Sequence, residues 1–276
     1  MIKVDRASIS EPRILTTKNS DPNGERNKII QYYESGSGIK VKFRLYSEDE
    51  VKEALRNLFN NKCAYCESMV SVASYPHIEH WRPKGGVTGQ TGHNGYYWLA
   101  SEWENLLLAC AICNGQSFKG NHFPLAAGYS YATKSTDDYR TLEKALLVNP
   151  CETDPTIHIT FNSLGFIKGL TDEGNQSVLY YGLDRDLLTI ERKKEADVVV
   201  RELRQILTLI AEVLRDHSRQ SINKKKIKEI VSFLRKRVEP EYQYAGMSRK
   251  LIKNFQTTHK RNLVFVGWTK IILKGY

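Results

Sequence analysis

The spacing of apolar residues predicts a helical C-terminal third. From Asp184, which can cap a helix, to roughly His217, apolar side chains recur every three or four positions, as on the buried face of an α-helix. The residues of this stripe are Val199, Leu203, Ile206, Ile210 and Val213. A second helix follows and ends before Pro240, because proline cannot continue a helix. Its buried stripe is formed by Ile227, Ile230, Val231 and Leu234.

Shorter elements are predicted before these helices. Ser47 is a good N-cap for a helix that leads to the first cysteine, with an apolar stripe formed by Val51, Leu55, Leu58 and Phe59. The apolar run 145–148 predicts a short strand. Alternation over 157–161, followed by turn residues at 162–165, predicts a β-hairpin. Residues 1–46 contain strong turn signals, so we expect an irregular lead-in there.

The composition is that of a globular protein. The chain has 276 residues, of which 41% are hydrophobic and 10% aromatic, enough to bury a core. Neither a bilayer-spanning apolar run nor a signal-like N-terminal stretch is present, so we expect a cytoplasmic protein without membrane contact. Five cysteines, four of them in metal-type spacing, fit a reducing compartment, and Cys151 is left as a half-buried thiol.

The positive charge is concentrated near the C-terminus. Net charge is +10, yet residues 1–183 carry 19 Lys/Arg against 20 Asp/Glu, while residues 184–276 carry 22 against 11. Such a basic block can attract nucleic-acid phosphates by releasing condensed counterions. It can equally be a solvated helical surface or a face for an acidic protein partner, and the charge alone does not decide between these interpretations.

Two Cys-x-x-Cys pairs predict a metal site. Thiolates at this spacing can bind one Zn²⁺ from a tight turn, and two such turns complete a closed tetrahedral Cys₄ site. The four ligands would be Cys63, Cys66, Cys110 and Cys113. A site with four protein ligands has no open position, so this zinc would be structural. The alternative is a zinc ribbon that only folds its domain, and the residues between the pairs argue against it.

Glu79 and His80, between the two pairs, carry chemistry suited to phosphodiester hydrolysis. That reaction needs a base that activates water and a divalent cation held by hard ligands. A carboxylate and an imidazole that is neutral near pH 7 offer these two functions. Adjacent residues of a strand point to opposite faces, however, so both can act on one phosphate only where the strand twists or ends. Pro83 is consistent with the strand ending there.

These motifs resemble the signature of HNH nucleases, whose active site is a ββα fold around one metal ion. The resemblance spans roughly residues 60–125 and rests on Cys-Ala-Tyr-Cys, Ile-Glu-His-Trp-Arg-Pro-Lys, Trp-Glu-Asn-Leu and Cys-Ala-Ile-Cys-Asn. It implies that His80 is the general base and that Glu79 is a metal ligand. It further implies that Asn105 orients the histidine-bearing loop and that Asn114 is the second metal ligand. Asn114 stands where the family name has histidine, and its amide favours Mg²⁺ or Mn²⁺ as the catalytic ion.

Four further side chains near this motif are candidate phosphate contacts: Arg82, Lys84, Lys119 and His122. Each could equally be an ordinary solvated residue. His77 we interpret as a strand surface residue, and the aromatic run 96–98 as part of the core rather than a base-stacking platform.

Over most of the chain, the pattern is similar to the HNH subunit of Septu-type anti-phage systems, including relatives in retron operons. The wider match includes Phe-Pro-Leu at 123–125, Val-Asn-Pro at 148–150 and Gly-Leu at 182–183. It implies an ABC-type ATPase partner and, in retron versions, a reverse transcriptase with its RNA-linked DNA. The resulting hypothesis is an effector endonuclease that cleaves nucleic acid, with DNA the first expectation. A ribonuclease of the same fold, acting on tRNA for example, and a non-catalytic zinc-bearing adaptor are the alternatives.

Together these patterns predict an α+β protein. An HNH ββα-metal core with a Cys₄ zinc site would be joined to a small β-hairpin and a largely α-helical, basic C-terminal region. The expected boundaries are 1–46 for the lead-in, 47–135 for the nuclease core and 136–276 for the hairpin and the helices that bind a partner or nucleic acid.

Overall fold

The computed structural model describes residues 1–36, 42–70 and 76–276, and this part of the chain is mostly helical with two small sheets. The helices in its first two thirds are α1 (Arg13–Asn19), α2 (Glu25–Ser35), α3 (Asp49–Leu58), α4 (Ala111–Asn114), α5 (Tyr139–Leu142) and α6 (Asp172–Tyr180). Those of the C-terminal third are α7 (Asp186–Arg215), α8 (Gln220–Val238), α9 (Ala245–Thr258) and α10 (Leu263–Ile272). The strands are β1 (His77–His80), β2 (Leu106–Ala109), β3 (Ile159–Phe161) and β4 (Ile167–Gly169). The mixed composition agrees with the α+β prediction.

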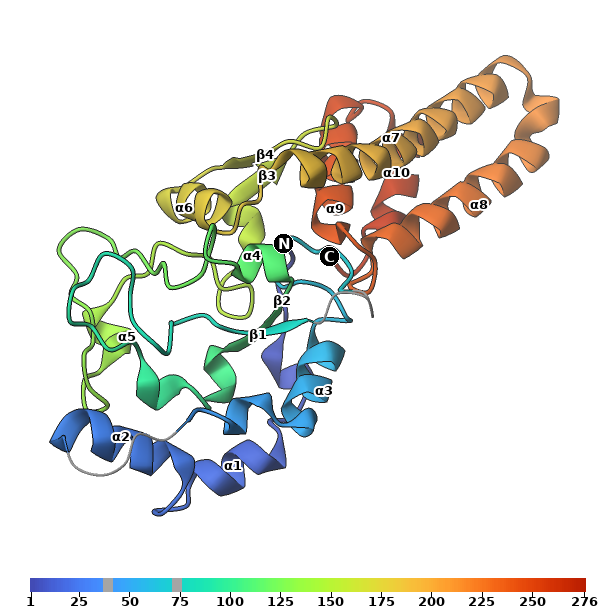
Figure 1. The fold of residues 1–276 in the computed structure, drawn as a ribbon. Helices are drawn as coiled ribbons and strands as arrows, with labels where there is room; N and C mark the ends of the chain where they lie inside the picture. Colours follow the sequence, from blue (N-terminus) through green and yellow to red (C-terminus); the bar gives the residue numbers. More distant parts are fainter. Residues whose placement is uncertain (37–41, 71–75) are drawn as a thin grey trace.

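Strands β1 and β2 lie at the centre of the molecule (Figure 1). They pair antiparallel, with His77 opposite Ala109 and His80 opposite Leu106. Every residue of β2 is buried, because β2 is a run of three leucines and an alanine that packs against α3. The chain then turns directly into the short helix α4, which contacts β1. The residues singled out in the sequence therefore lie on or next to two antiparallel strands and the helix that follows them.

The prediction of an irregular segment over 1–46 was wrong, because the structure contains α1 and α2 there. Helix α1 has no side-chain cap of its own. The carboxylate of Glu50, on α3, instead accepts hydrogen bonds from the backbone nitrogens of Arg13 and Ile14 at 2.5 and 3.3 Å. Leu15 is fully buried beneath it. This helix is stabilised by a tertiary cap and by packing, neither of which has a local sequence signature.

The other elements follow the sequence more closely. The predicted β-hairpin is confirmed as β3 and β4, and the two long helices are confirmed as α7 and α8. The strand predicted at 145–148 was wrong: Ala145 makes only an isolated bridge to Leu125. Val148 donates its backbone N–H to the Ser177 hydroxyl at 2.8 Å. The acceptor is therefore a side chain and not the backbone of a neighbouring strand.

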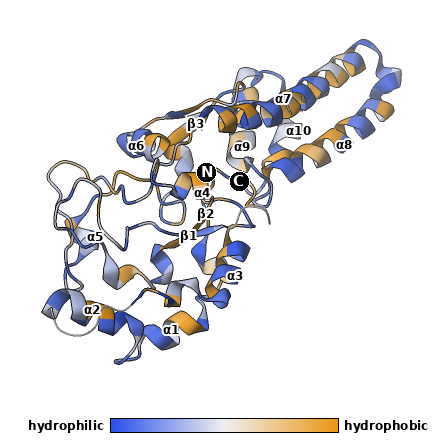
Figure 2. Cartoon of the chain, in the orientation of Figure 1, coloured by the Kyte–Doolittle hydropathy of each residue, from blue (hydrophilic) through white to orange (hydrophobic). Residues whose placement is uncertain are grey.

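Apolar faces of α7 and α8 meet each other, while their outer faces and the connection between them are hydrophilic (Figure 2). Within the described residues, no helix is both long enough and apolar enough to cross a membrane.

Candidate active site and metal centre

The four predicted zinc ligands come together. Cys63 and Cys66 lie in the turn after α3, Cys110 follows β2, and Cys113 is in α4. Their sulfur atoms all lie within 4.8 Å of one another, and the Sγ atoms of Cys66 and Cys110 are 3.9 Å apart. A tetrahedral zinc with bonds of about 2.3 Å needs sulfur separations of about 3.8 Å. The cluster therefore has the size and the donor chemistry of a closed zinc site.

Hydrogen-bond donors surround these sulfurs. The backbone nitrogen of Cys113 approaches Cys110 Sγ at 3.4 Å, and Arg185, next to the start of α7, donates to Cys113 Sγ at 3.4 Å. Four thiolates around a divalent ion carry an excess of negative charge, which the Arg185 guanidinium can offset. This contact also ties the C-terminal helices to the cysteine cluster.

Glu79 is a buried carboxylate on β1 whose partners are a lysine and a tyrosine. Lys119 Nζ lies 3.2 Å from its Oε1, and the Tyr65 hydroxyl donates to the same atom at 3.3 Å. Burial raises the pKa of Glu79, and Lys119 opposes this rise. Because Lys119 is fully buried as well, the two charges depend on each other inside the protein.

His80 is 5% exposed, and both of its ring nitrogens have partners. Its Nε2 lies 3.0 Å from the backbone carbonyl oxygen of Ala100, and its Nδ1 lies 3.3 Å from Lys84 Nζ. A carbonyl accepts hydrogen bonds only, so Nε2 carries the proton and Nδ1 presents its lone pair to the ammonium group. Burial, followed by the charge of Lys84, holds the pKa of His80 well below its ordinary value. The imidazole is therefore neutral at pH 7, with a basic nitrogen in a defined position.

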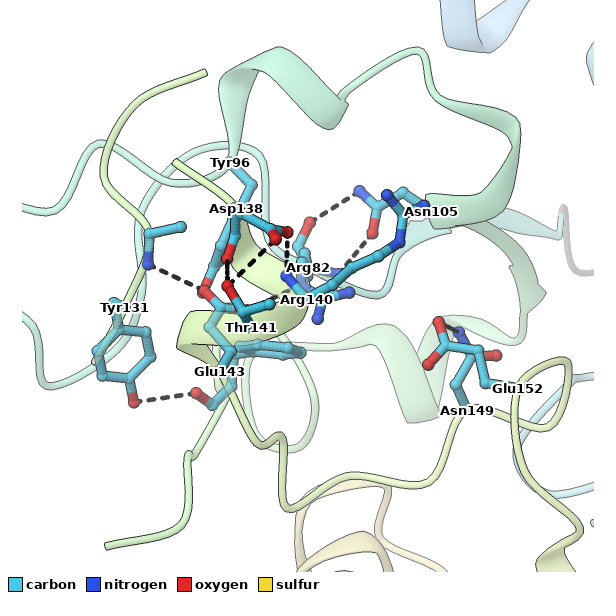
Figure 3. Close-up of polar contacts among 12 residues, drawn as sticks. Arg82, Tyr96, Asn105, Tyr131, Asp138, Arg140, Thr141, Glu143, Asn149 and Glu152 are labelled. Carbon is cyan, nitrogen blue, oxygen red and sulfur yellow. Dashed lines mark hydrogen bonds and ion pairs between the residues drawn. The ribbon is translucent and has the colours of Figure 1, made fainter. Parts of the chain in front are cut away.

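Asn105 fixes the backbone just after His80 (Figure 3). Its Oδ1 accepts from the backbone nitrogen of Arg82 at 2.8 Å, while its Nδ2 donates to the carbonyl oxygens of Arg82 and Leu99 at 3.0 and 3.1 Å. The backbone nitrogen of Trp81 also donates to the Asn105 carbonyl oxygen at 3.0 Å. One buried amide thus joins the end of β1 to the segment before β2.

Asn114 contacts His77 instead of Glu79: its Nδ2 lies 3.3 Å from His77 Nδ1. His77, which we interpreted as a surface residue, is indeed exposed. Alternation along β1 places His77 and Glu79 on the same face of the strand. Asn114, on α4, therefore lies beside the His77 end of this face, and Lys119 lies beside the Glu79 end.

The four candidate phosphate contacts occupy different environments. Lys119 is buried against Glu79, and Lys84 is half-buried with its ammonium 4.6 Å from the Tyr46 ring centroid. Arg82 donates through Nε to Glu143 at 2.9 Å. His122 Nδ1 lies 2.8 Å from the Phe118 carbonyl oxygen.

Glu143 is a structural residue that the sequence analysis did not single out. Buried beneath Arg82, it accepts from Arg82, from the Tyr96 hydroxyl at 2.6 Å and from the backbone nitrogen of Ala132 at 3.0 Å (Figure 3). It lies 61 residues from Arg82 in the chain, and nothing in its local sequence indicates the contact. Glu143 therefore helps Asn105 to hold the segment that follows β1.

A cavity of about 560 Å³ lies on the Asn105 side of this segment. Arg82, Asn105, Glu143 and Glu152 are among its lining residues, whereas Glu79 and His80 are not. The candidate chemistry is thus at a buried cluster next to the cavity, and we place the site by its side-chain chemistry and not by the cavity.

The similarity of the chain to known proteins extends beyond residues 60–125, which contain the motifs. No protein-family model matches the chain. Over 242 residues it is 38% identical to the Septu protein PtuB of Bacillus mycoides (strain KBAB4), covering 84% of this chain and 80% of that protein. Over 101 residues it is 32% identical to the Septu protein PtuB of Bacillus thuringiensis, covering 36% of this chain and 33% of that protein. The first similarity includes most of the C-terminal helices as well as the cysteine and histidine motifs, because so little of the chain lies outside it.

Proposed function

The chain belongs to the family of the Septu protein PtuB, and on this premise we propose that it is a metal-dependent HNH endonuclease acting in anti-phage defence. The proposal includes an ABC-type ATPase partner, which the family resemblance implies. It does not include a reverse transcriptase, since the names of the two relatives refer to Septu alone. DNA is the first substrate to test. The nuclease core is proposed to extend over 47–135, with 136–276 available for a partner or nucleic acid.

The observation that carries the proposal is the state of His80. A neutral imidazole whose Nε2 donates to the Ala100 carbonyl has one unprotonated basic nitrogen, Nδ1, and Asn105 fixes the backbone beside it. In the proposed mechanism Nδ1 takes a proton from a water molecule, whose oxygen then bonds to phosphorus while the bond from phosphorus to one ester oxygen breaks. The leaving oxygen takes a proton from solvent.

Lys84 must leave Nδ1 before His80 can act as a base. In the free protein its ammonium group lies 3.3 Å from that nitrogen and would compete with water for the lone pair. A charge-assisted hydrogen bond to a phosphate oxygen is stronger than one to a neutral imidazole. We therefore propose that the substrate phosphate draws Lys84 away and exposes the base when substrate is bound.

Glu79 and Asn114 would hold the divalent ion. Their oxygens are hard donors, one from β1 and one from α4, which contacts β1. Mg²⁺ needs only one or two protein carboxylates when water and phosphate complete its shell. Lys119 now neutralises Glu79, so a bound ion would share or replace that contact. When bound, the ion supplies a Lewis acid that stabilises negative charge on the scissile phosphate. The Cys₄ cluster, whose thiolates suit Zn²⁺, would hold a separate structural ion.

The decisive experiment is substitution of the proposed base. His80→Ala should abolish cleavage of plasmid DNA by the purified protein with its ATPase partner and Mg²⁺ or Mn²⁺, while zinc content stays near wild type and circular dichroism shows a folded protein. His259→Ala is the matched control, because this histidine lies just after α9 and packs on Phe255 and Phe265. Total tRNA is tested in parallel. Cleavage by His80→Ala at the wild-type rate would remove the proposed mechanism.

A further inference from the structure

Helices α7 and α8 form an arm that extends from the rest of the molecule (Figure 1). Buried apolar residues of each helix pack against the other, including Leu203 and Ile206 on α7 and Ile227 and Leu234 on α8. Near the tip, the buried Asn223 donates through Nδ2 to the Leu209 carbonyl oxygen at 3.1 Å and to Glu212 at 3.0 Å. These contacts fix the two helices against each other, so the outer side of α8 is held by a rigid support.

Most of the net charge of the protein lies on one side of this arm. Residues 220–238, which form α8, contain seven Lys/Arg and one Asp/Glu, a net charge of +6 within a chain whose total is +10. On α7, by contrast, three cations are paired with carboxylates of the same helix. Lys193 lies 2.6 Å from Asp197, Lys194 lies 2.6 Å from Glu191, and Arg201 contacts Glu202 at 2.8 Å.

Five lysines of α8 are exposed and have no carboxylate partner among the described residues: Lys224, Lys225, Lys226, Lys228 and Lys236. Two arginines of the same helix form contacts with other parts of the protein. Arg235 donates to the Ile271 carbonyl oxygen at 2.9 Å, and Arg237 pairs with Glu195. The helix therefore separates its cations, with arginines directed to structural contacts and lysines to solvent. We call the five lysines the α8 lysine face.

We infer that the α8 lysine face binds the phosphate backbone of double-stranded nucleic acid, as a second contact surface for the substrate of the proposed nuclease. From Lys224 to Lys236 the face is about 18 Å long, at about 1.5 Å per helical residue. Phosphates follow each other at about 3.4 Å along one strand of a duplex, so the face spans about five of them. The inference rests on the proposed function for the identity of this substrate.

The chemistry of the face favours nucleic acid over a protein partner. Protein interfaces are depleted in lysine and enriched in arginine and aromatic residues. Here lysine predominates, and the guanidinium group of Arg237 covers the partly exposed ring of Phe233, 4.4 Å from its centroid. Lysine contacts to phosphate need no fixed geometry and carry no sequence information. The face would add affinity without sequence preference.

The test is the salt dependence of binding. The triple variant K224Q/K225Q/K228Q removes three unpaired charges, and glutamine preserves helix propensity. The matched control, K193Q/K194Q/R201Q, removes three paired charges from the other helix of the arm. Binding of the full chain to a labelled duplex is measured by fluorescence anisotropy without divalent metal, between about 50 and 200 mM salt. Circular dichroism verifies that both variants are folded.

The expected result is quantitative. Each lost phosphate contact lowers the slope of log affinity against log salt by about 0.9, so the α8 triple variant should lose about 2.7 of the wild-type slope. The control should lose less than about one. A wild-type slope in the α8 triple variant overturns the inference, and so does loss of ATPase binding in gel filtration with the slope unchanged, since the face then belongs to the protein partner.

The outcomes also separate this inference from the proposed nuclease mechanism. Binding is measured without cleavage, and the His80→Ala protein serves as an additional background for it. An unchanged salt slope refutes the role of α8 and leaves the role of His80 intact. Cleavage by His80→Ala refutes the proposed mechanism, and a reduced slope in the α8 triple variant would still establish the lysine face.

Discussion

The contact between Lys84 and His80 makes the pH dependence of cleavage testable by one substitution. Lys84→Met removes the ammonium group while keeping a side chain of similar length. Only the neutral form of His80 can accept a proton, so cleavage should fall as the pH drops through the pKa of this histidine. In the wild type burial and Lys84 both lower that pKa, and the loss of activity should therefore occur below pH 6.5, the ordinary histidine value.

The size of the effect follows from the distance. Two unit charges 3.3 Å apart interact by about 5 kcal/mol at an effective dielectric constant of about 20. Lys84 is half-buried, so solvent screening reduces this upper limit, and we use about 1.4 kcal/mol. That energy corresponds to about a tenfold change in the protonation equilibrium. Burial is the larger cause and persists in the variant, so the acid limb should move towards pH 6.5 without passing it.

The assay is a pH profile of single-turnover cleavage at protein concentrations below saturation, which reports the free protein, where Lys84 contacts His80. The range is about pH 5 to 8, where histidine changes its charge. Lys84→Met also removes a candidate phosphate contact, so the overall rate should fall, and the position of the acid limb is the informative quantity. Lys193→Met is the control, since this lysine pairs with Asp197 on α7. An acid limb that stays in place, or moves to lower pH, would refute the proposed coupling of Lys84 to His80.

Two further substitutions test the framework of the site. Asn105→Ala removes three hydrogen bonds at the segment after β1; at about 1 kcal/mol each, the free energy of unfolding should fall by about 3 kcal/mol in urea titrations, and an unchanged value would mean that the amide is not structurally important. Cys110→Ser should lower the zinc content and the melting temperature together, because a structural zinc contributes directly to folding. Chelator treatment of the wild type should reproduce that loss, and a zinc-free protein with the wild-type melting temperature would contradict a structural role for the cluster.

Local patterns were sufficient to predict the elements that depend on local chemistry. The apolar stripe of α3 is buried, and Cys-x-x-Cys spacing was enough to predict the four-sulfur cluster. Asp184, the predicted helix cap, lies one residue before Arg185, which occupies the N-cap position of α7 and makes no side-chain cap hydrogen bond. These features depend on neighbours a few positions away, and their signals are therefore contained in short windows of sequence.

The missed features depend on contacts between distant residues. Helix α1 is capped by Glu50, 37 residues from Arg13, and Glu143 reaches Arg82 across 61 residues. Residues 145–148 have the composition of a strand, yet the position of Ser177 gives Val148 a side-chain acceptor. The spacing of apolar residues in a short segment does not indicate which distant residue will form a hydrogen bond with a backbone group. Tertiary contacts can therefore override the secondary-structure propensity of a segment.

The arrangement of Glu79 and His80 depends both on local strand alternation and on contacts with residues outside the strand. Strand alternation predicted that their side chains would diverge, and their contacts do differ: Glu79 meets Lys119, whereas His80 meets Ala100. Lys84 affects both, because its charge lowers the pKa of each group. It reaches them from four residues after His80, beyond the end of β1. Carboxylate and imidazole are thus coupled through the charge of Lys84, and the proposed movement of this lysine to a phosphate would not require the strand to bend.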